Sequence, residues 1–365
     1  MMNAQELRQK HKQIIYRKFS WKFAKTLDIS FEYFIPPNLT FKPNLQIHFP
    51  DTTCKSEPSA ALMDNLVFHL GLIDMFSYWK LVCAPVIKIQ AGYLSKNQVS
   101  WWHKLLINGM GEYFYKNRID FTEPAFVTWK AESTNKFAPT KIETTNKYLV
   151  LMGGGKDSLL VQKILQEQQK STLCLWVNPL PGKSIRPPVS DQPLIQVHRQ
   201  IDPLLFQLNQ ENYLNGHVPY SAYLAFLSLL AATITGSKYV VVGNEKSADE
   251  ANVLYLGQKI NHQYSKSYEF EKYFRGYAVR NISPDISYFS FLRPLYELQI
   301  TKLFSKYTQY FTTFSSCNRY KSSGIWCGKC PKCLSIFLLL SPFTGISKMS
   351  KIFNPQGAIR FLFVI

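Results

Sequence analysis

Six consecutive residues near the middle of the chain, Gly153 to Ser158 with the letters GGGKDS, have the composition of an anion-binding loop. The apolar run 148–152 precedes them and the apolar-periodic stretch 159–165 follows them, so the order strand, glycine loop, helix is predicted. Glycines allow backbone N–H groups to turn inward onto a compact anion, and the first turn of the helix adds the positive end of its dipole. Asp157 and Ser158 stand where they can cap that helix or reach a metal ion. The alternative is a turn that binds nothing, in which three glycines would cost backbone entropy without compensation.

The letters of the loop distinguish between two kinds of phosphate site. A Walker loop needs a glycine five positions before its Gly-Lys and a Ser or Thr after the lysine, but Val150 and Asp157 stand there. The stretch instead resembles the S-G-G-x-D-S loop of the PP-loop ATP pyrophosphatases, with Gly153 in place of the first Ser. This resemblance implies that the loop residues hold the phosphates of ATP, that Lys156 neutralises the leaving diphosphate, and that Asp157 orients Mg²⁺. The residues so implied are Gly153, Gly154, Gly155, Lys156, Asp157 and Ser158.

Four of the seven cysteines cluster near the C-terminal end, at Cys317, Cys327, Cys330 and Cys333. Four thiolates at short spacing suit tetrahedral Zn²⁺ with every position filled, which predicts a structural zinc knuckle over 317–333. A redox pair or free thiols are the alternatives. The other three cysteines, Cys54, Cys83 and Cys174, are scattered, which favours a metal site in a reducing compartment over a disulfide framework.

Composition restricts the class of protein. The 365 residues are 46% hydrophobic and 15% aromatic, which excludes disorder and suggests two domains. The net charge of +18 favours anionic partners, but no block of five like charges exists, which argues against a nucleic-acid tail. The N-terminus lacks a secretory signal, and the apolar stretch 218–236 carries recurring polar side chains typical of a buried helix. A cytoplasmic protein with no membrane span and no nucleic-acid partner is expected.

The order of elements predicts an α/β fold. A smaller N-terminal α+β domain is expected over 1–135, a linker over 136–147, a catalytic domain over 148–345, and a short tail over 346–365. From residue 148 onward strands and helices alternate, which predicts a doubly wound parallel sheet. The predicted elements are strands 148–152, 172–177, 194–198 and 238–243 and helices 156–169 and 219–235, with helical stretches around 60–80 and 97–117 and a strand at 30–35 in the N-terminal region. Ligands bind such sheets at the carboxyl ends of strands, where both the glycine loop and Asn244-Glu245 fall.

Further stretches carry a more specific resemblance. The glycine loop and the cysteine spacing, with 218–224, are similar to 7-cyano-7-deazaguanine synthase, which implies a PP-loop, adenine nucleotide alpha hydrolase-like fold. A closer resemblance is to the ATP-dependent UDP-N-acetylmuramoyl-L-alanyl-L-glutamate epimerases of peptidoglycan synthesis. Its matching stretches are 68–72, 77–80, 101–104, 152–158, 216–219, 244–248, 261–271 and 326–333. This resemblance spans 60–345, and residues 1–55 have no counterpart in it.

The epimerase resemblance implies inversion of the terminal L-Glu of UDP-MurNAc-L-Ala-L-Glu to D-Glu, with ATP converted to AMP and diphosphate. An α-proton beside a carboxylate is barely acidic, because enolisation would concentrate two negative charges. Adenylation of that carboxylate removes one charge, so a side-chain base can take the proton and the other face can receive one. The alternatives are another PP-loop ligase that modifies a deazapurine or a tRNA base, and a nucleotide-binding module without catalysis.

The bases that move this proton are the least determined residues. His217 and His262 are the first candidates because imidazole titrates near neutrality. The rivals are Lys266, Glu269 and Cys83.

Other polar and aromatic residues have two interpretations each. Asn244 and Glu245 contact ribose or magnesium, or they form a capping pair. Lys266, Arg275, Arg280 and Arg293 bind diphosphate or carboxylates, or are solvated surface. His69, Trp79, Trp101 and Trp102 belong to the N-terminal core, or they form a platform for uridine or sugar.

Overall fold

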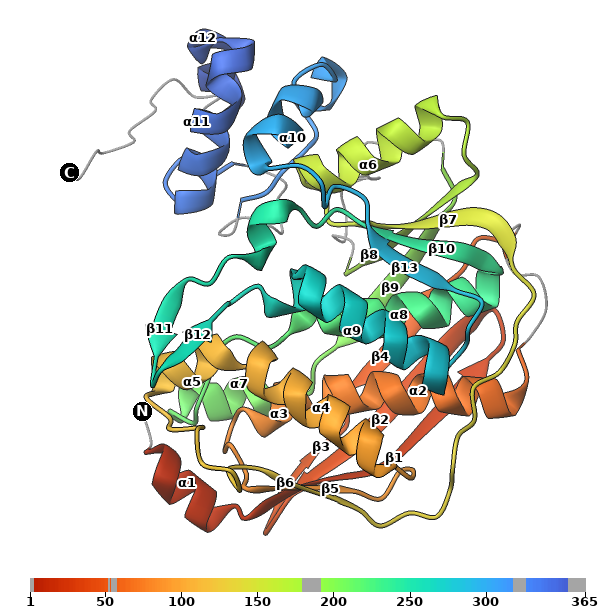
Figure 1. The fold of residues 1–365 in the computed structure, drawn as a ribbon, viewed down its shortest axis with the longest axis vertical. Coiled ribbons are helices and arrows are strands. Elements are labelled where there is room, and N and C mark those ends of the chain that lie inside the picture. Colours follow the sequence, from red (N-terminus) through yellow and green to blue (C-terminus); the bar gives the residue numbers. More distant parts are fainter. Residues whose placement is uncertain (1–2, 52, 54–57, 179–191, 318–325, 354–365) are drawn as a thin grey trace.

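The computed structural model describes residues 3–51, 53, 58–178, 192–317 and 326–353. Cys54, the stretch 318–325 inside the predicted knuckle and the tail residues 354–365 lie outside this described part. In this described part, a mixed sheet of eleven strands forms the centre, with helices packed against it and a separate two-stranded hairpin beside it (Figure 1). The sheet strands are β1 (Gln13–Phe23), β2 (Thr26–Ile35), β3 (Leu39–Phe41), β4 (Asn44–His48), β5 (Val86–Ile89), β6 (Thr128–Ala131), β7 (Thr145–Met152), β8 (Thr172–Val177), β9 (Leu194–Gln200), β10 (Ser237–Val242) and β13 (Ser287–Ser290), and the hairpin is β11 (Val253–Tyr255) with β12 (Gln258–Ile260).

Helices connect these strands and cover them. The α-helices are α1 (Ala4–Lys10), α2 (Ala60–Asp74), α3 (Phe76–Trp79), α4 (Lys96–Gly109), α5 (Gly111–Asn117), α6 (Lys156–Glu167), α7 (Pro203–Gln210), α8 (Tyr220–Thr235), α9 (Tyr268–Asn281), α10 (Glu297–Phe304), α11 (Pro331–Thr344) and α12 (Ile346–Phe353). The described residues also form short 3-10 helices, η1 (Lys246–Asp249), η2 (Tyr264–Lys266) and η3 (Thr308–Tyr310). The helices and strands predicted from the sequence are all present, with ends that differ by a few residues.

The strand order is β13-β10-β7-β8-β9-β4-β2-β1-β5-β6, with β3 beside β2. The strands from β13 to β9 are mutually parallel, as predicted, and β5 and β6 run parallel to β1. The central pairs β9–β4, β4–β2 and β2–β1 are antiparallel. The parallel sheet predicted from residue 148 onward is confirmed, and the antiparallel pairs come from the N-terminal strands β1, β2 and β4, so the whole sheet is mostly parallel but mixed.

Both faces of the parallel half are buried. Successive side chains of a strand point to opposite faces. In β10, Val240 and Val242 accordingly join the core beneath α2 and α8, whereas Val241 joins a second core with α6 and the C-terminal helices. In β7, Leu149 and Val150 divide in the same way. Because both faces of these strands are buried, their sequences are uninterrupted runs of apolar residues.

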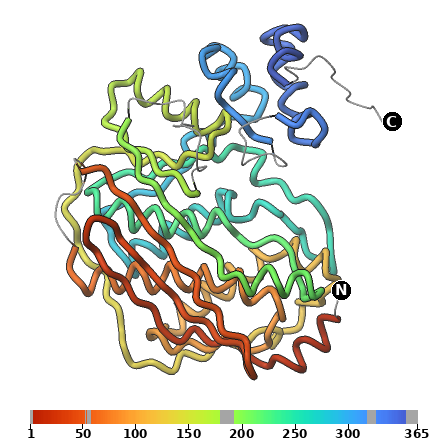
Figure 2. The backbone as a smooth tube through the Cα atoms, turned by 180° about the vertical axis from the view of Figure 1, so that it is seen from behind, coloured from red at the N-terminus to blue at the C-terminus, as the bar shows by residue number. Residues whose placement is uncertain are grey.

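The N-terminal strands extend the same sheet. Viewed from behind, the red strands of the N-terminal region lie beside the green strands of the later half (Figure 2). In β2 buried and more exposed positions alternate strictly, which is the pattern of a sheet covered on one face only. The pairing of β4 with β9 joins the two regions on either side of 136–147, which contains no regular element before β7 begins at Thr145. The domain boundary expected at 136–147 remains a prediction. The central sheet continues across the two regions that this boundary separates.

A buried ion pair also joins the two regions. Arg199 on β9 lies 2.6 Å from Asp74 at the end of α2, and their side chains are 10% and 2% exposed. The hydroxyls of Tyr33 and Ser77 complete this polar cluster, and the guanidinium stacks over the ring of Tyr223 on α8 at 4.4 Å. Because both charges are withdrawn from water, each depends on the other for compensation.

One helical stretch of the described residues, Ala60–Trp79, is apolar and long enough to cross a membrane, judged by length and composition. Its most apolar 18 residues are 83% buried inside the fold, as is usual for a core helix. The shorter apolar helix α8 is also buried along almost all of Ala222 to Thr235, which confirms its interpretation as a core helix.

The aromatic cluster of the N-terminal region belongs to the core. Trp79, Trp101, Trp102 and His69 are at most 3% exposed, so the alternative of an open platform for uridine is wrong. The indole N–H of Trp102 donates to the Tyr277 hydroxyl at 2.9 Å, and that oxygen lies 2.9 Å from Nε2 of His69. Nδ1 of His69 lies 2.8 Å from the Asn65 carbonyl, which can only accept. Nδ1 therefore carries the proton and Nε2 is the acceptor.

Burial lowers the pKa of His69 to about 4, so acid should destabilise the protein through this residue. Because its pKa is lower when folded than when unfolded, its contribution is constant above about pH 6.5 and is lost as the pH falls toward 4. The expected loss in the free energy of unfolding is about 3 kcal/mol. Denaturant titrations between these pH values should show this slope in the wild type and in a variant of the exposed residue His198, His198→Gln. His69→Gln should lose the slope, and an unchanged slope in His69→Gln would contradict the assignment.

Candidate active site

The glycine loop joins the end of β7 to the start of α6, as predicted. Gly154 has φ +74°, in the left-handed region that favours glycine. The Ser158 hydroxyl closes the turn, because it donates to the Gly155 carbonyl at 3.2 Å and accepts from the Gly153 N–H at 3.3 Å. A Cβ on Gly155 would lie 2.7 Å from the Ser316 hydroxyl, whereas a Cβ on Gly153 would meet nothing within 4 Å. Gly155 is the N-cap of α6 and provides no side-chain cap, so the geometry suits an anion at the helix start.

Lys156 is buried behind this loop. Its side chain is 2% exposed, and Nζ lies 2.5 Å from Oδ1 of Asp157 and 3.4 Å from Oε1 of Glu297. Burial alone would lower the pKa of Lys156, but the carboxylates of Asp157, Glu297 and Glu245 outweigh it and the pKa is raised. The lysine is therefore a fixed positive charge among carboxylates and not an exposed side chain of the loop.

Glu245 reaches the same place from the end of β10. Its Oε1 accepts from the Ser247 hydroxyl at 2.8 Å, while its Oε2 is buried and has no hydrogen-bond partner among the described residues. Burial, with a contribution from Glu297, raises the pKa of Glu245. A Cβ on Gly243 would lie 3.2 Å from Cβ of Asp157, so the end of β10 directly contacts the start of α6. A buried carboxylate oxygen without a partner fits a cation or a ligand hydroxyl.

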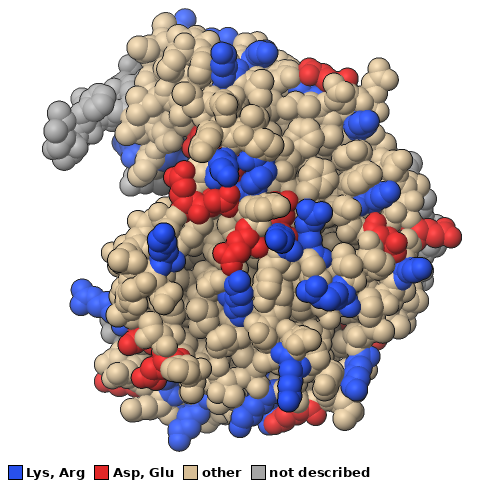
Figure 3. All heavy atoms as spheres, viewed as in Figure 1, with Lys and Arg blue, Asp and Glu red and all other residues tan. Residues whose placement is uncertain are grey.

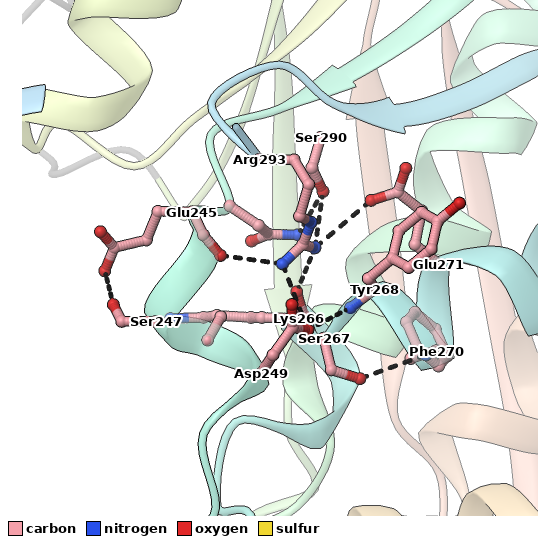
Figure 4. A network of polar contacts seen from close by, with 12 residues as sticks. Glu245, Ser247, Asp249, Lys266, Ser267, Tyr268, Phe270, Glu271, Ser290 and Arg293 are labelled. Atoms are coloured by element: carbon pink, nitrogen blue, oxygen red, sulfur yellow. Dashed lines mark hydrogen bonds and ion pairs between the residues drawn. The ribbon is translucent and has the colours of Figure 1, made fainter. Parts of the chain in front are cut away.

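Arg293 ties several loops around Glu245 together (Figure 4). Its guanidinium donates to the backbone carbonyls of Glu245 at 2.8 Å and Lys266 at 2.6 Å, and it also pairs with Glu271 at 3.3 Å and Asp249 at 3.5 Å. These contacts occupy the arginine inside the protein. It therefore positions the loop after β10 against η2 and α9, whereas Arg275 and Arg280 are exposed on α9.

Three of the predicted bases lie close enough to interact electrostatically. Burial lowers the pKa of His217. The nearby His262 and Lys266 lower this pKa further, whereas Glu112 on α5 raises it. Nδ1 of His217 lies 3.8 Å from Oε2 of Glu112. His262 contacts the side chains of Asn252 and Gln263. The fold thus brings the candidate bases His217, His262 and Lys266, here called the base cluster, near Glu112 from separate segments.

The other two candidates have different surroundings. Glu269 pairs with Lys104 at 2.8 Å and its side chain is 59% exposed. Cys83 is fully buried in the N-terminal core, with the Arg8 guanidinium 3.4 Å from its sulfur, and burial raises its pKa to about 11. A thiol with that pKa is protonated near neutral pH and is a poor base.

The four clustered cysteines converge as predicted. Their sulfur atoms all lie within 4.8 Å of one another, with separations of 4.0 Å for Cys317–Cys330, 3.7 Å for Cys327–Cys333 and 3.4 Å for Cys330–Cys333. Tetrahedral coordination with bonds of about 2.3 Å places ligand sulfurs about 3.8 Å apart. The cluster could therefore hold a metal ion.

This cluster is adjacent to the glycine loop. The Ser315 N–H donates to the Gly154 carbonyl at 3.0 Å, and the Ser315 hydroxyl accepts from the N–H of Cys317 at 3.5 Å. Lys332 on α11 lies 3.9 Å from Glu297. The C-terminal helices therefore form one wall beside the loop, and Figure 3 shows a notch in the molecular outline between these helices and the rest of the protein, with acidic and basic side chains beside it.

A cavity of about 790 Å³ opens beside the base cluster. It lies between α4, the β11–β12 hairpin, η2 and the start of α9, and Asn261, the neighbour of His262, lines it. Glu269 is also in its wall.

Two residues of the site were not predicted from the sequence. Glu297 begins α10 after β13, so its position at the carboxyl edge of the sheet was a usable signal, but β13 itself was not predicted. Glu112 lies on a helix of the N-terminal region and has no motif around it. Only the fold brings it to His217.

Comparison with known proteins finds two matching family descriptions. The MurL N-terminal domain matches residues 5–291 and the MurL C-terminal domain matches residues 313–358. The first match includes strands β1 to β4, for which the sequence alone offered no counterpart.

Individual relatives agree with these matches. The UDP-N-acetyl-alpha-D-muramoyl-L-alanyl-L-glutamate epimerase of Xanthomonas oryzae pv. oryzae (strain MAFF 311018) is 31% identical over 305 residues, which are 81% of this chain and 66% of that protein. A protein of the same name from Salinispora tropica is 32% identical over 306 residues, which are 82% of this chain and 66% of the relative. A third, from a Micromonospora species, is 30% identical over 82% of this chain and 67% of its own length. The chain thus spans about two thirds of the length of these relatives.

Proposed function

Because the chain belongs to the MurL family, we propose that it inverts the terminal L-glutamate of UDP-MurNAc-L-Ala-L-Glu to D-glutamate at the expense of ATP, in peptidoglycan precursor synthesis. The observation that carries the proposal is a chain of contacts through Arg293. Arg293 donates to the carbonyl of Glu245, whose carboxylate acts on Lys156 of the glycine loop, and to the carbonyl of Lys266, which acts electrostatically on His217. A requirement for ATP and a nucleotide-linked substrate is consistent with a cytoplasmic location.

The loop supports a PP-loop role in binding ATP. The backbone of Gly153 to Gly155 and the start of α6 would hold its phosphates, and Lys156 would neutralise the leaving diphosphate. Asp157, Glu245 and Glu297 would supply the oxygen ligands that Mg²⁺ prefers, and Oε2 of Glu245, which has no hydrogen-bond partner among the described residues, fits this role. Bound Mg²⁺ would offset the charge of the phosphates.

The chemistry needs both halves of the site. A carboxylate oxygen of the terminal glutamate attacks the α-phosphorus of ATP, and diphosphate leaves. The glutamyl carbon then bears a mixed anhydride, so its α-proton becomes acidic enough for a side chain to remove it. We assign this removal to His217, whose lowered pKa keeps it neutral, and the return of a proton on the opposite face to His262 or Lys266. Water then releases AMP and the inverted product.

Incubation with ATP, Mg²⁺ and UDP-MurNAc-L-Ala-L-Glu in deuterated water tests the proposal. The expected products are AMP, diphosphate and D-glutamyl product with deuterium at the α-carbon. AMP without α-deuterium would indicate a different acyl transfer, as in other PP-loop ligases. No AMP would indicate a nucleotide-binding module without this activity.

The pH dependence tests the role of His217. The pKa of His217 lies below the ordinary value of 6.5. The pH at which kcat/KM declines on the acid side should therefore also lie below 6.5. Glu112 raises the pKa of His217, so Glu112→Gln should lower this pKa further and move the acid limb to still lower pH. The matched control is Glu211→Gln, at the end of α7, which should leave the limb in place. An acid limb that does not move in Glu112→Gln would contradict the assignment.

We also propose that the cysteine cluster binds structural Zn²⁺. Cys330→Ser should reduce the zinc content from about one ion per chain to near zero, because one of the four ligands is lost. Because Ser315 connects the cluster to Gly154, ATP should also bind more weakly. Elemental analysis and ATP titration measure the two effects, with Cys174→Ser as the control cysteine outside the cluster. Full zinc content in Cys330→Ser would refute the site.

A further inference from the structure

We infer that the 790 Å³ cavity between α4, the β11–β12 hairpin and α9 binds the uridine diphosphate end of the nucleotide-sugar substrate. This inference rests on the proposed function, since it assigns one part of that substrate to one part of the same site. The glycine loop is reserved for ATP, so the second nucleotide needs a place of its own. The cavity is next to the base cluster through Asn261 and His262, so a substrate held there can extend its glutamate toward His217.

The charges of the cavity favour an anion. Its wall contains two carboxylates, and both already have partners: Asp249 accepts from the Tyr268 N–H at 2.6 Å and pairs with Arg293, and Glu269 pairs with Lys104. Its wall also contains Lys259 and Lys272, which are exposed and have no carboxylate partner among the described residues. Two lysines without carboxylate partners beside neutralised acids suit a diphosphate.

The aromatic and amide side chains of the cavity favour a nucleobase as ligand. Tyr268 lines it and is 51% exposed, and no ring contact of Tyr268 is seen among the described residues. Such a ring is a stacking surface for a base. Tyr264 is 6% exposed, yet its hydroxyl makes no well-formed hydrogen bond among the described residues. Asn108 and Glu269 are near enough to shift the pKa of this hydroxyl, the first downward and the second upward. A buried hydroxyl and the amide of Asn108 can donate to and accept from the edge of uracil.

The position of the cavity agrees with the rest of the site. Asp249 and Tyr268 border both the cavity and the Arg293 network, which leads on to Glu245 (Figure 4). A ligand in the cavity and a nucleotide on the glycine loop would therefore lie on opposite sides of Arg293. That separation suits a substrate whose nucleotide is at one end and whose reacting carboxylate is at the other.

Titration calorimetry with UDP alone tests the inference on the full chain. The wild type should bind UDP, and Tyr268→Ala should weaken this binding by about tenfold or more, because the stacking surface is lost. Lys272→Gln, at an exposed position that tolerates the change, should weaken it about two- to fivefold. The control Phe206→Ala removes a ring that is 53% exposed on α7 and should leave UDP affinity unchanged. Thermal melting confirms that each variant is folded.

The outcomes separate this inference from the proposed function. Equal UDP affinity in Tyr268→Ala and wild type, absence of UDP binding by the wild type, or displacement of UDP by AMP would each overturn the cavity assignment. If α-deuteration with AMP formation is nevertheless observed in the wild type, the proposed function stands and the nucleotide end binds elsewhere. If UDP binding depends on Tyr268 but no AMP forms with the full substrate, the cavity assignment stands and the proposed reaction fails.

Discussion

Asp157→Asn is expected to reduce AMP formation by at least about a thousandfold while the protein remains folded. The substitution keeps the shape of the side chain but removes the charge that faces Lys156 at 2.5 Å and that would help to hold Mg²⁺ against the phosphates. The side chain of Asp157 is 40% exposed at the mouth of the loop, so its loss creates no buried cavity. Steady-state AMP release with the full substrate measures the effect.

The control uses a carboxylate of the same helix. Glu167 lies at the far end of α6, where it pairs with Lys163 at 3.8 Å and accepts from the Tyr307 hydroxyl. Glu167→Gln should leave AMP formation within about twofold of the wild type, because an exposed pair of this kind contributes little. AMP formation by Asp157→Asn at the wild-type rate would remove Asp157 from the catalytic machinery.

Arg199→Met is expected to lower the free energy of unfolding by about 3–5 kcal/mol, because Asp74 would be left buried without its compensating charge. Burial alone would lower the pKa of Arg199, but Asp74 outweighs it and the pKa is raised, so the guanidinium stays charged. Denaturant titration measures the loss. Since the pair joins α2 to β9, both halves of the sheet should unfold in one transition.

The same substitution at an exposed arginine provides the comparison. Arg17 pairs with Glu32 at 3.3 Å and is 38% exposed, so Arg17→Met should cost about 1 kcal/mol or less. The double variant Arg199→Met, Asp74→Asn should recover part of the loss, since it no longer buries a lone charge. Equal losses for Arg17→Met and Arg199→Met, with no recovery in the double variant, would show that the buried pair has no special role.

The sequence was sufficient for the elements whose signal is local. The apolar run before Gly153 and the glycines themselves predict β7, the loop and α6, because strand burial, left-handed backbone and helix start each need particular residues within a few positions. The four cysteines were equally direct, since metal ligands must be close in space and three of them are close in sequence. The family resemblance supplied the proposed function, which these local signals alone do not give.

The long-range pairing of strands could not be predicted from the sequence. The antiparallel register of β4 on β9 brings residues about 150 positions apart into contact, and nothing local in 44–48 specifies that partner. For the same reason the sequence did not predict Glu112 and Glu297. Glu112 interacts with His217 and Glu297 interacts with Lys156, and both partners lie in distant segments of the chain. Burial of Lys156 also could not be read from its place in a loop, because it results from the packing of α10 and the end of β10 around it.

Transfer of an isotope from substrate to nucleotide tests the central claim most directly. UDP-MurNAc-L-Ala-L-Glu labelled with ¹⁸O in its terminal α-carboxylate is incubated with ATP and Mg²⁺, and the AMP is analysed by mass spectrometry. If the carboxylate attacks the α-phosphorus and water later attacks the glutamyl carbon, each AMP carries one labelled oxygen. AMP that contains no label, formed together with inverted product, would contradict an acyl-adenylate and with it the assignment of the glycine loop.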